Sequence, residues 1–537
     1  MAHGGASDSY YNNGPGQPPM QTQMPYPPQA PYTSVVQGGP HYQQAPPNYG
    51  DNYQNDGATS DGKQTFDQAF KLDRPKYNDL WAGILLILTI LGFAAVSGLS
   101  LQGYAANKSG NAGSGIYNNP NNFSLNTNTI ILFAFVLGVA FVFSWLYFMA
   151  ARAFTKQFIW ITGILHIVFG VATAIYYFYR HYYSAGVVFA LFSVFSIICF
   201  ISWIPRIPFS VVMLQQAMDV AKNFGHVFLL SFLGGCASLA FGAWFSVTLV
   251  AVYVKYEPNG SGSNSSCQSG STGSCSTAKV IGLIVFLTFA SYWISEWIKN
   301  TLHSTVAGVY GSWFFCGGKP GGMPRGVTRG AFRRSMTYSF GSIAFGSLVV
   351  ALINMLRQAV SIAQSTEAQQ GDIIASILFC VLGCIIGIVQ WAVQFINRYA
   401  FSHIALYGKA YIPAAKDTWK MMRDRGIDAL VNDCLISPVL TMGSTFVAYL
   451  CALLAFLYLE FSKPEYNTGG KYTPVVMAFS FLIGLQVCQI FMTPIGSGVD
   501  TIFVASAWDP QVLMRDHPDF YARMVGVYPK VQQMIHA

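Results

Sequence analysis

The fold class is decided by residues 333–357, RRSMTYSFGSIAFGSLVVALINMLR. Arg333 and Arg334 open this stretch and Arg357 closes it, and the 22 residues between Arg334 and Arg357 carry no charge. A helix needs about 20 residues to cross the hydrocarbon core of a bilayer. The stretch therefore predicts a membrane-spanning helix.

Small residues recur along this stretch at Ser335, Ser339, Ser342 and Gly346. Their spacing of four, three and four places them on one face of a helix. In lipid, a face of small residues lets a neighbouring helix approach closely. We expect Ser339, Ser342 and Gly346 to form a helix-packing face inside a bundle, the alternative being a lipid-facing span with incidental small residues.

The composition agrees with a membrane protein. The chain has 537 residues, of which 53% are hydrophobic and only 10% charged, and its mean hydropathy is +0.39. Soluble domains are about 25% charged. The net charge of +8 lies largely in short loops beside apolar segments, where it sets orientation, so we expect no nucleic-acid partner.

Ten apolar segments predict an all-α, ten-span domain over residues 76–500 in the bilayer, followed by a cytoplasmic tail over 501–537. The apolar piece 306–315 is too short to cross, and we place it on one side. The expected spans are 80–101, 130–150, 158–177, 183–203, 227–253, 280–298, 335–356, 373–396, 437–459 and 475–493.

The first 75 residues, rich in Pro, Tyr and Gln, predict a disordered cytoplasmic tail, since such a segment buries too little apolar surface to fold. Within it, Pro46, Pro47, Asn48 and Tyr49 form a PPxY pattern. WW domains bind such proline-rich segments, so the pattern predicts a WW-domain ubiquitin ligase as partner. A chance match in a Pro- and Tyr-rich tail is the alternative.

The basic residues test the number of spans. With the amino terminus inside, 23 of the 30 Lys and Arg residues fall on the cytoplasmic side and 7 on the other. Cytoplasmic loops carry an excess of Lys and Arg. The threefold bias supports ten spans with both termini in the cytoplasm.

The predicted outer loops carry features of an external compartment. Cys267 and Cys275 lie close enough to form a disulfide in an oxidising compartment, two free thiols being the alternative. Four N-x-Ser patterns also fall in these loops and predict N-glycosylation. Their asparagines are Asn107, Asn122, Asn259 and Asn264.

Several longer motifs resemble the choline transporter-like family of solute carriers, in its fungal branch. They are SFGSIAFGS at 339–347 with the residues up to Arg357, SHIALYGK at 402–409, GSWFF at 311–315 and NRYA at 397–400. The resemblance runs from about Lys63 to the end of the chain. It implies a ten-span plasma-membrane protein, with both termini cytoplasmic, that transports choline or a related amine. We expect no enzyme activity, no cofactor and no metal.

The sixth predicted span holds the candidate site for such a cation. A quaternary ammonium is held by aromatic faces and nearby negative charge, and Glu296 is the acidic residue placed most deeply in any predicted span, since Glu460 and Asp500 lie at or beyond span ends. Glu296, Asn300 and His303 share one helix face. The candidate binding residues are Trp293, Glu296, Trp297, Asn300, Trp391 and Tyr399.

An alternative interpretation stays open for each part of this site. Glu296 can reach the cytoplasmic interface or pair with Lys299. Trp293, Trp297 and Trp391 can belong to an interfacial aromatic belt. Two function classes follow: a secondary transporter, or a non-transporting membrane scaffold or stress-related factor that acts through its tail.

The topology can be tested by labelling introduced cysteines from outside intact cells. We expect labelling near Ser263 and Gly469, because both fall in predicted outer loops, and none near Gly326. Labelling at Gly326 would contradict the ten-span arrangement.

Overall fold

A computed structural model describes the chain over residues 65–70, 76–109, 127–179, 181, 183–224, 226–256, 277–319, 321–370, 373–424, 434–463 and 473–529. All of these residues belong to one compact unit, Pro47–Ala537. The PPxY pattern and the rest of residues 1–64 lie outside the described residues.

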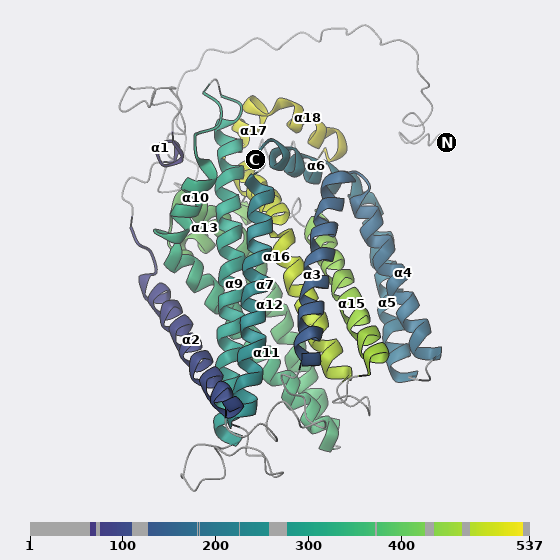
Figure 1. The fold of residues 1–537 in the computed structure, drawn as a ribbon. Helices are drawn as coiled ribbons and strands as arrows, with labels where there is room; N and C mark the ends of the chain where they lie inside the picture. The colour runs from purple at the N-terminus through teal and green to yellow at the C-terminus, as the bar shows by residue number, and fades with distance from the viewer. Residues whose placement is uncertain are drawn as a thin grey trace, which may run out of the picture. The chain divides into compact units, whose positions relative to one another are not determined.

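Long helices form the body of this unit (Figure 1). In the described part of the chain, ten helical segments are long and apolar enough to cross a membrane, which confirms the predicted all-α, ten-span fold. The long helices are α2 (Leu80–Ser109), α3 (Thr127–Ala153), α4 (Phe158–Tyr179), α5 (Tyr183–Trp203), α7 (His226–Tyr256), α9 (Thr277–Cys316), α11 (Phe340–Gln370), α12 (Ile373–Tyr407), α15 (Ile436–Ser462) and α16 (Thr473–Trp508).

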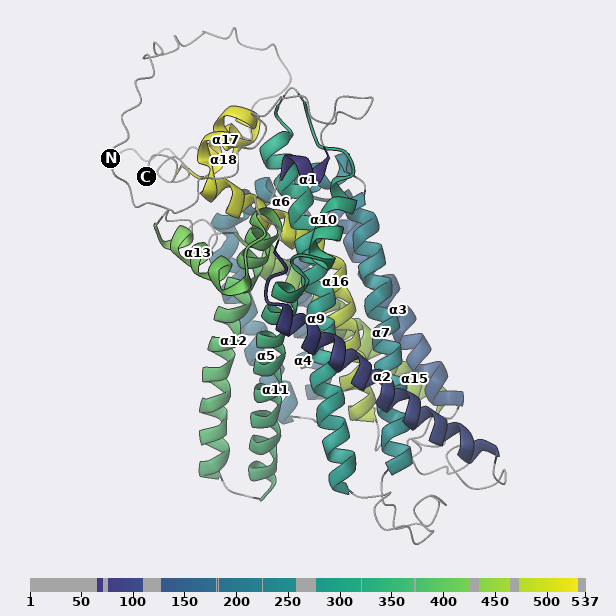
Figure 2. The ribbon, with the colours of Figure 1, turned by 90° about the vertical axis from the view of Figure 1, so that its left-hand side faces the viewer.

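Short helices gather at one end of the bundle, which we call the cap (Figures 1 and 2). The connections that reach the cap are those to which the sequence assigned most of the basic residues. The cap helices are α1 (Phe66–Ala69), η1 (Ile204–Arg206), α6 (Ile207–Asn223), α10 (Val327–Met336), α13 (Tyr411–Asp424), α17 (Pro510–Asp516) and α18 (Pro518–Val527).

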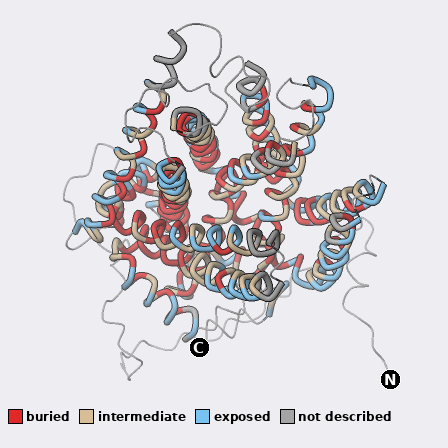
Figure 3. Tube along the Cα trace, turned by 90° about the horizontal axis from the view of Figure 1, so that it is seen from below, coloured by how far each residue is buried: buried red, intermediate tan, exposed pale blue. Residues whose placement is uncertain are grey.

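Burial follows the helix faces, with buried residues on the sides that meet other helices (Figure 3). Large apolar side chains such as Ile84, Leu191 and Ile198 are more than half exposed, at 51%, 66% and 61%. A water-soluble protein rarely exposes so much apolar surface in continuous bands. These faces are the surface that lipid covers.

The apolar piece 306–315 continues α9 without a break and is not a separate segment. It forms part of the core of the cap, because Val306, Tyr310 and Phe314 are all buried. The Tyr310 hydroxyl donates a hydrogen bond of 2.6 Å to the Ala217 carbonyl oxygen of α6. α9 therefore links the membrane bundle to the cap as one rigid rod.

The seventh predicted span does not begin at residue 335, so that boundary was wrong. The chain turns between α10, which ends at Met336, and α11, which begins at Phe340. Arg334 explains the break, because its guanidinium donates 2.6 Å to the Phe70 carbonyl oxygen and lies 3.3 Å from the Asp67 carboxylate. With Arg334 held in the cap by these contacts of its Nη2 atom, only the uncharged part of the stretch enters the bundle.

The tenth predicted span also ends later than residue 493, because α16 continues through Pro494 to Trp508. Proline is tolerated inside membrane helices when neighbouring groups satisfy the freed carbonyl. The expectation that Asp500 lies at or beyond a span end was therefore wrong. Its side chain is 3% exposed, within the helix.

The small residues of the deciding stretch are all buried, although Ser335 is on α10 and Ser339 precedes α11. Ser342 donates 2.7 Å to Asp79 beside α2. A Cβ added to Gly346 would lie 2.6 Å from the Phe401 ring and 2.7 Å from the Tyr411 ring. At this point α11 touches both α12 and α13.

Gly346→Leu tests this contact. We expect it to lower the free energy of unfolding by about 1–3 kcal/mol, because the new side chain overlaps two buried rings. Gly387→Leu is the matched control on α12, since no atom lies within 4 Å of an added Cβ there. Thermal unfolding in detergent measures both, and equal melting temperatures for Gly346→Leu and the wild type would show that α11 is not tightly packed here.

Candidate functional site among α9, α11, α12 and α16

Glu296 lies deep in the bundle. The Asn300 amide donates 2.9 Å to the Ser347 hydroxyl, which is seven residues past the start of α11 at Phe340. At 1.5 Å per residue, Asn300 lies about 10 Å, and Glu296 about 16 Å, from that end of α11. Glu296 also lies midway along α9, which runs from Thr277 to Cys316, so it lies inside the bundle and not at a helix end.

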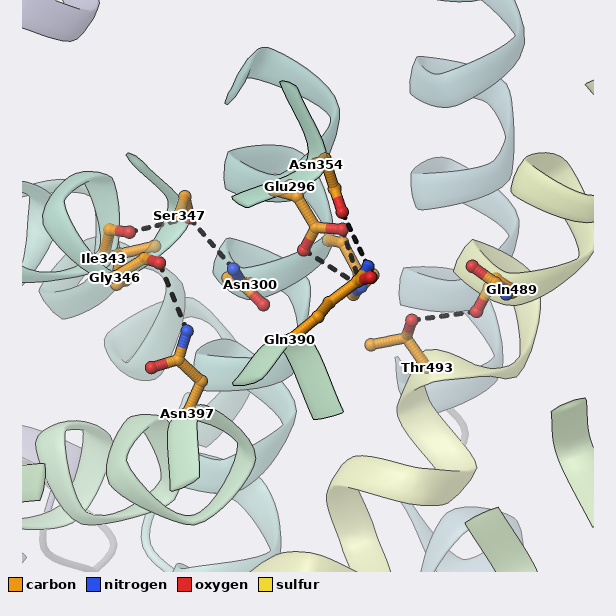
Figure 4. Close-up of polar contacts among 11 residues, drawn as sticks. Glu296, Asn300, Ile343, Gly346, Ser347, Asn354, Gln390, Asn397, Gln489 and Thr493 are labelled. Atoms are coloured by element: carbon orange, nitrogen blue, oxygen red, sulfur yellow. Dashed lines mark hydrogen bonds and ion pairs between the residues drawn. The ribbon is translucent and has the colours of Figure 1, made fainter. Parts of the chain in front are cut away.

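The nearest partner of Glu296 is on its own helix. The Lys299 ammonium lies 3.0 Å from both carboxylate oxygens of Glu296 (Figure 4). The side chain of Glu296 is 16% exposed and that of Lys299 is 30% exposed. This salt bridge corresponds to the sequence alternative in which Glu296 pairs with Lys299, but it lies inside the bundle and not at an interface.

Three other helices present polar side chains near this level. The side-chain amide of Gln390 on α12 donates a hydrogen bond of 2.6 Å to the side-chain oxygen of Asn354 on α11. On α16, the Thr493 hydroxyl donates a hydrogen bond of 2.9 Å to the backbone carbonyl oxygen of Gln489. In Figure 4, Asn354 points toward Gln390, to which it is hydrogen-bonded, and Thr493 lies beyond them next to Gln489. We call Glu296, Asn354, Gln390 and Thr493 the polar layer; all four are partly exposed.

Closer to the cap, Asn397 is buried and its side chain is hydrogen-bonded at both ends. The side-chain amide of Asn397 donates a hydrogen bond of 3.2 Å to the backbone carbonyl oxygen of Gly346. The Tyr411 hydroxyl of α13 donates a hydrogen bond to the side-chain oxygen of Asn397. Burial raises the pKa of Tyr411 to about 12, so its hydroxyl keeps the proton that it donates. Asn397 thereby joins α11, α12 and the cap.

His303 makes the next set of contacts, one turn beyond Asn300. Its Nε2 lies 3.1 Å from the Ser402 hydroxyl of α12, and its Nδ1 lies 2.7 Å from the Ser497 hydroxyl of α16. Ser402 in turn lies 3.1 Å from the Thr501 hydroxyl. These four residues are at most 5% exposed and hold α9, α12 and α16 together.

A charged pair completes the closure on the cap side. Asp500 of α16 is hydrogen-bonded by Tyr399 and interacts electrostatically with Arg398, both of α12. Arg398 also donates to the Ser437 hydroxyl at the start of α15. The buried Asp500 side chain thus connects α16 to α12 through its hydrogen bond with Tyr399 and its electrostatic interaction with Arg398.

The aromatic candidates are dispersed. Trp293 is fully buried, and its indole N–H donates 2.9 Å to the Ala344 carbonyl oxygen. Trp297 packs edge-on against Phe340 at 5.7 Å, and Trp391 is 63% exposed on the outer surface of α12. The structure thus brings Glu296 and Asn300 into one polar column with Tyr399 near its cap end, but it does not bring Trp293 or Trp391 to the polar layer.

Five members of the site escaped the sequence analysis: Asn354, Gln390, Thr493, Arg398 and Asp500. Asn354 and Gln390 are uncharged residues in largely apolar segments, and the sequence does not show that they face each other across two helices. Asp500 was missed because the tenth predicted span ended at residue 493. Arg398 was counted as a cytoplasmic charge, although it lies inside the apolar segment Val381–Tyr407.

The predicted modifications fall largely outside the described residues. This holds for Cys267 and Cys275 and for the sequons at Asn122, Asn259 and Asn264. Asn107 lies in the last turn of α2, which ends at Ser109.

Comparison with known proteins points to one family. A family model described as a plasma-membrane choline transporter matches residues 187–511. The chain is 60% identical over 470 residues to the protein pns1 of Aspergillus fumigatus, covering 88% of this chain and 87% of that protein. It is 56% identical to PNS1 of Gibberella zeae over 99% of both chains, and 41% identical to PNS1 of Saccharomyces cerevisiae over 87% of both.

Asp500→Asn tests the charged pair. We expect a loss of about 1–3 kcal/mol in the free energy of unfolding, because the buried Tyr399 and Arg398 side chains lose the carboxylate with which they interact. Combining it with Arg398→Gln should cost less than the sum of the single changes. Thermal unfolding of the three variants completes the cycle, and strict additivity would contradict the pairing.

Proposed function

The chain belongs to the plasma-membrane choline transporter family, as its motifs indicated, and we propose that it is a secondary transporter of choline or a related small amine. Glu296 is the binding carboxylate in this proposal. The observation that carries the proposal is a partly exposed carboxylate midway along a membrane-spanning helix, at a level where three other helices carry polar side chains.

Exposure of the polar layer supports a water-filled path. A carboxylate and several amides that faced lipid would cost several kcal/mol, so ionisable groups inside membranes face a cavity or the bundle interior. The exposed fractions fall toward the cap, from 16% at Glu296 to 5% at His303 and 3% at Asn397. We infer that the path opens toward the end opposite the cap and is closed at the cap.

An organic cation fits this layer by charge and by shape. The Glu296–Lys299 bridge is partly exposed, and such pairs contribute only about 0–1 kcal/mol, so a cation can displace Lys299. Tyr292, one turn further from the cap, is half-buried and offers an aromatic face. The side-chain oxygen of Asn354 accepts from Gln390, and that of Gln390 accepts 2.8 Å from the Arg357 guanidinium, so in this proposal a bound cation shares these oxygens with their present donors.

Orientation and location complete the proposal. The excess of basic residues on the cap side supports a cytoplasmic position for the cap and both termini, in a plasma-membrane protein. The conformation described here is then open to the outside, and the contacts of His303, Asn397 and Asp500 form the inner gate. Recruitment of a WW-domain ubiquitin ligase by Pro46, Pro47 and Tyr49 belongs to the same proposal, since a surface transporter needs a route for removal.

Uptake of radiolabelled choline by the purified protein in liposomes tests the role of Glu296. Glu296→Gln keeps the shape and removes the charge, so we expect the KM for choline to rise roughly three- to tenfold. Lys299→Gln should lower the KM, because it removes the competing cation. Glu460→Gln, at an exposed position near the far end of α15, is the matched control and should transport like the wild type.

Each result decides between defined alternatives. Unchanged uptake in Glu296→Gln would move the site elsewhere in the bundle. If wild-type protein carried neither choline nor any of a panel of small amines, the transport proposal would fail and a scaffold acting through its tail would be favoured.

A further inference from the structure

A cavity in the cap is separate from the polar layer and is not used by the proposed transport. It has a volume of about 460 Å³. Four segments meet around it: the end of α3, the connection to α4, α6 and α18. The lining residues are Arg152, Ala153, Thr155, Lys156, Gln157, Gln215, Asp219, Lys222 and Arg523.

The lining is strongly basic. Four cations and one carboxylate, Asp219, give it a net charge of +3. The salt bridges found among the described residues include none of these five side chains, although Asp219 stands in the same wall. All four cations are exposed around one shared hollow, so they give it an excess of positive charge that attracts an anion.

Two of the cations are held in place by uncharged neighbours. The Arg523 guanidinium donates a hydrogen bond of 2.8 Å to the side-chain amide oxygen of Gln216 on α6. The Arg152 guanidinium lies 4.5 Å from the centre of the Phe228 ring. Both contacts orient an arginine at the wall while leaving its charge uncompensated, which is the arrangement of a preformed anion site.

We propose that this cavity binds a phosphomonoester group. A carboxylate presents two oxygens in one plane, whereas a phosphomonoester carries about −1.5 to −2 charges and three acceptor oxygens. Only the second can meet cations that approach from α3, the connection, α6 and α18 at once. A volume of about 460 Å³ also suits a phosphorylated headgroup or sugar better than a bare ion.

The cavity is within reach of both lipid and water. The apolar segment of α3 ends at Ala153, which is itself in the lining, and the next residue, Phe154, is 56% exposed. The site therefore lies where the membrane helices meet the cap. A phosphorylated lipid headgroup and a soluble phosphate ester offer the same chemistry here, and the experiment separates them.

The experiment measures thermal stabilisation of the purified full chain in detergent by three probes. The probes are inorganic phosphate, soluble inositol trisphosphate and a short-chain phosphatidylinositol bisphosphate. We expect the melting temperature to rise by several degrees with at least one phosphomonoester probe, since a ligand that binds only the folded state stabilises it. Citrate at the same concentration should have little effect.

The lysines supply the variants, because neither makes an ion pair in the described structure. Lys156→Gln and Lys222→Gln, alone and combined, should abolish the shift without lowering the melting temperature of the free protein. Lys420→Gln is the control, since this lysine is exposed on α13, outside the cavity. Its shift should equal that of the wild type.

Each outcome supports or overturns the proposal. A shift with the lipid probe alone assigns a membrane headgroup, and equal shifts with the lipid and inositol trisphosphate assign the phosphate group from either source. No shift with any probe, an equal shift with citrate, or a shift that survives in the double lysine variant would overturn it. None of these results depends on transport.

Discussion

The need to satisfy polar groups inside a lipid-embedded bundle governs how the helices meet. α9 carries a polar stripe, and each member except Glu296 finds its partner on another helix. Asn300 is bonded to Ser347 of α11, and His303 to Ser402 of α12 and Ser497 of α16. An unsatisfied polar group in hydrocarbon costs several kcal/mol, so these bonds select one mutual arrangement of the four helices where apolar packing alone would allow many.

Glu296 differs from the rest of the stripe because its partner, Lys299, is on the same helix. Its bond therefore holds no two helices together. A ligand can replace Lys299 without loosening the bundle, while replacing a partner of His303 would separate α9 from α12 or α16. The same stripe thus contains one residue suited to binding and others suited to closing the bundle.

Part of this arrangement was readable from the sequence. Uncharged stretches of about 20 residues identified the ten spans, because lipid thickness imposes that length. Spacing along α9 placed Glu296, Asn300 and His303 on one face, since helical periodicity is local. The breaks were not readable: Arg334 ends a helix because of contacts with Phe70 and Asp67, more than 250 positions away.

The site was harder to predict than the fold for the same reason. Trp293 is three positions before Glu296, but its buried indole N–H donates to the backbone carbonyl oxygen of Ala344, so its ring packs against α11. Gln390 and Asn354 belong to the polar layer because α11 and α12 bring them together at 2.6 Å. Sequence spacing identifies the residues of one helix face, whereas the partners across the interface depend on tertiary packing.

A further set of bonds connects the polar column to the cap. Asp79, just before α2, accepts 2.7 Å from Ser342 of α11 and 2.8 Å from the Tyr411 backbone N–H of α13. The Tyr411 side chain then donates to Asn397, which is bonded to the Gly346 carbonyl oxygen. Any opening at the cap end that moves α12 away from α11 must break the bond between Asn397 and Gly346, and it either carries α13 along or breaks the bond from Tyr411. Because Tyr411 contributes both its backbone and its side chain, α13 is bonded both to the entry of α2 and to the buried column.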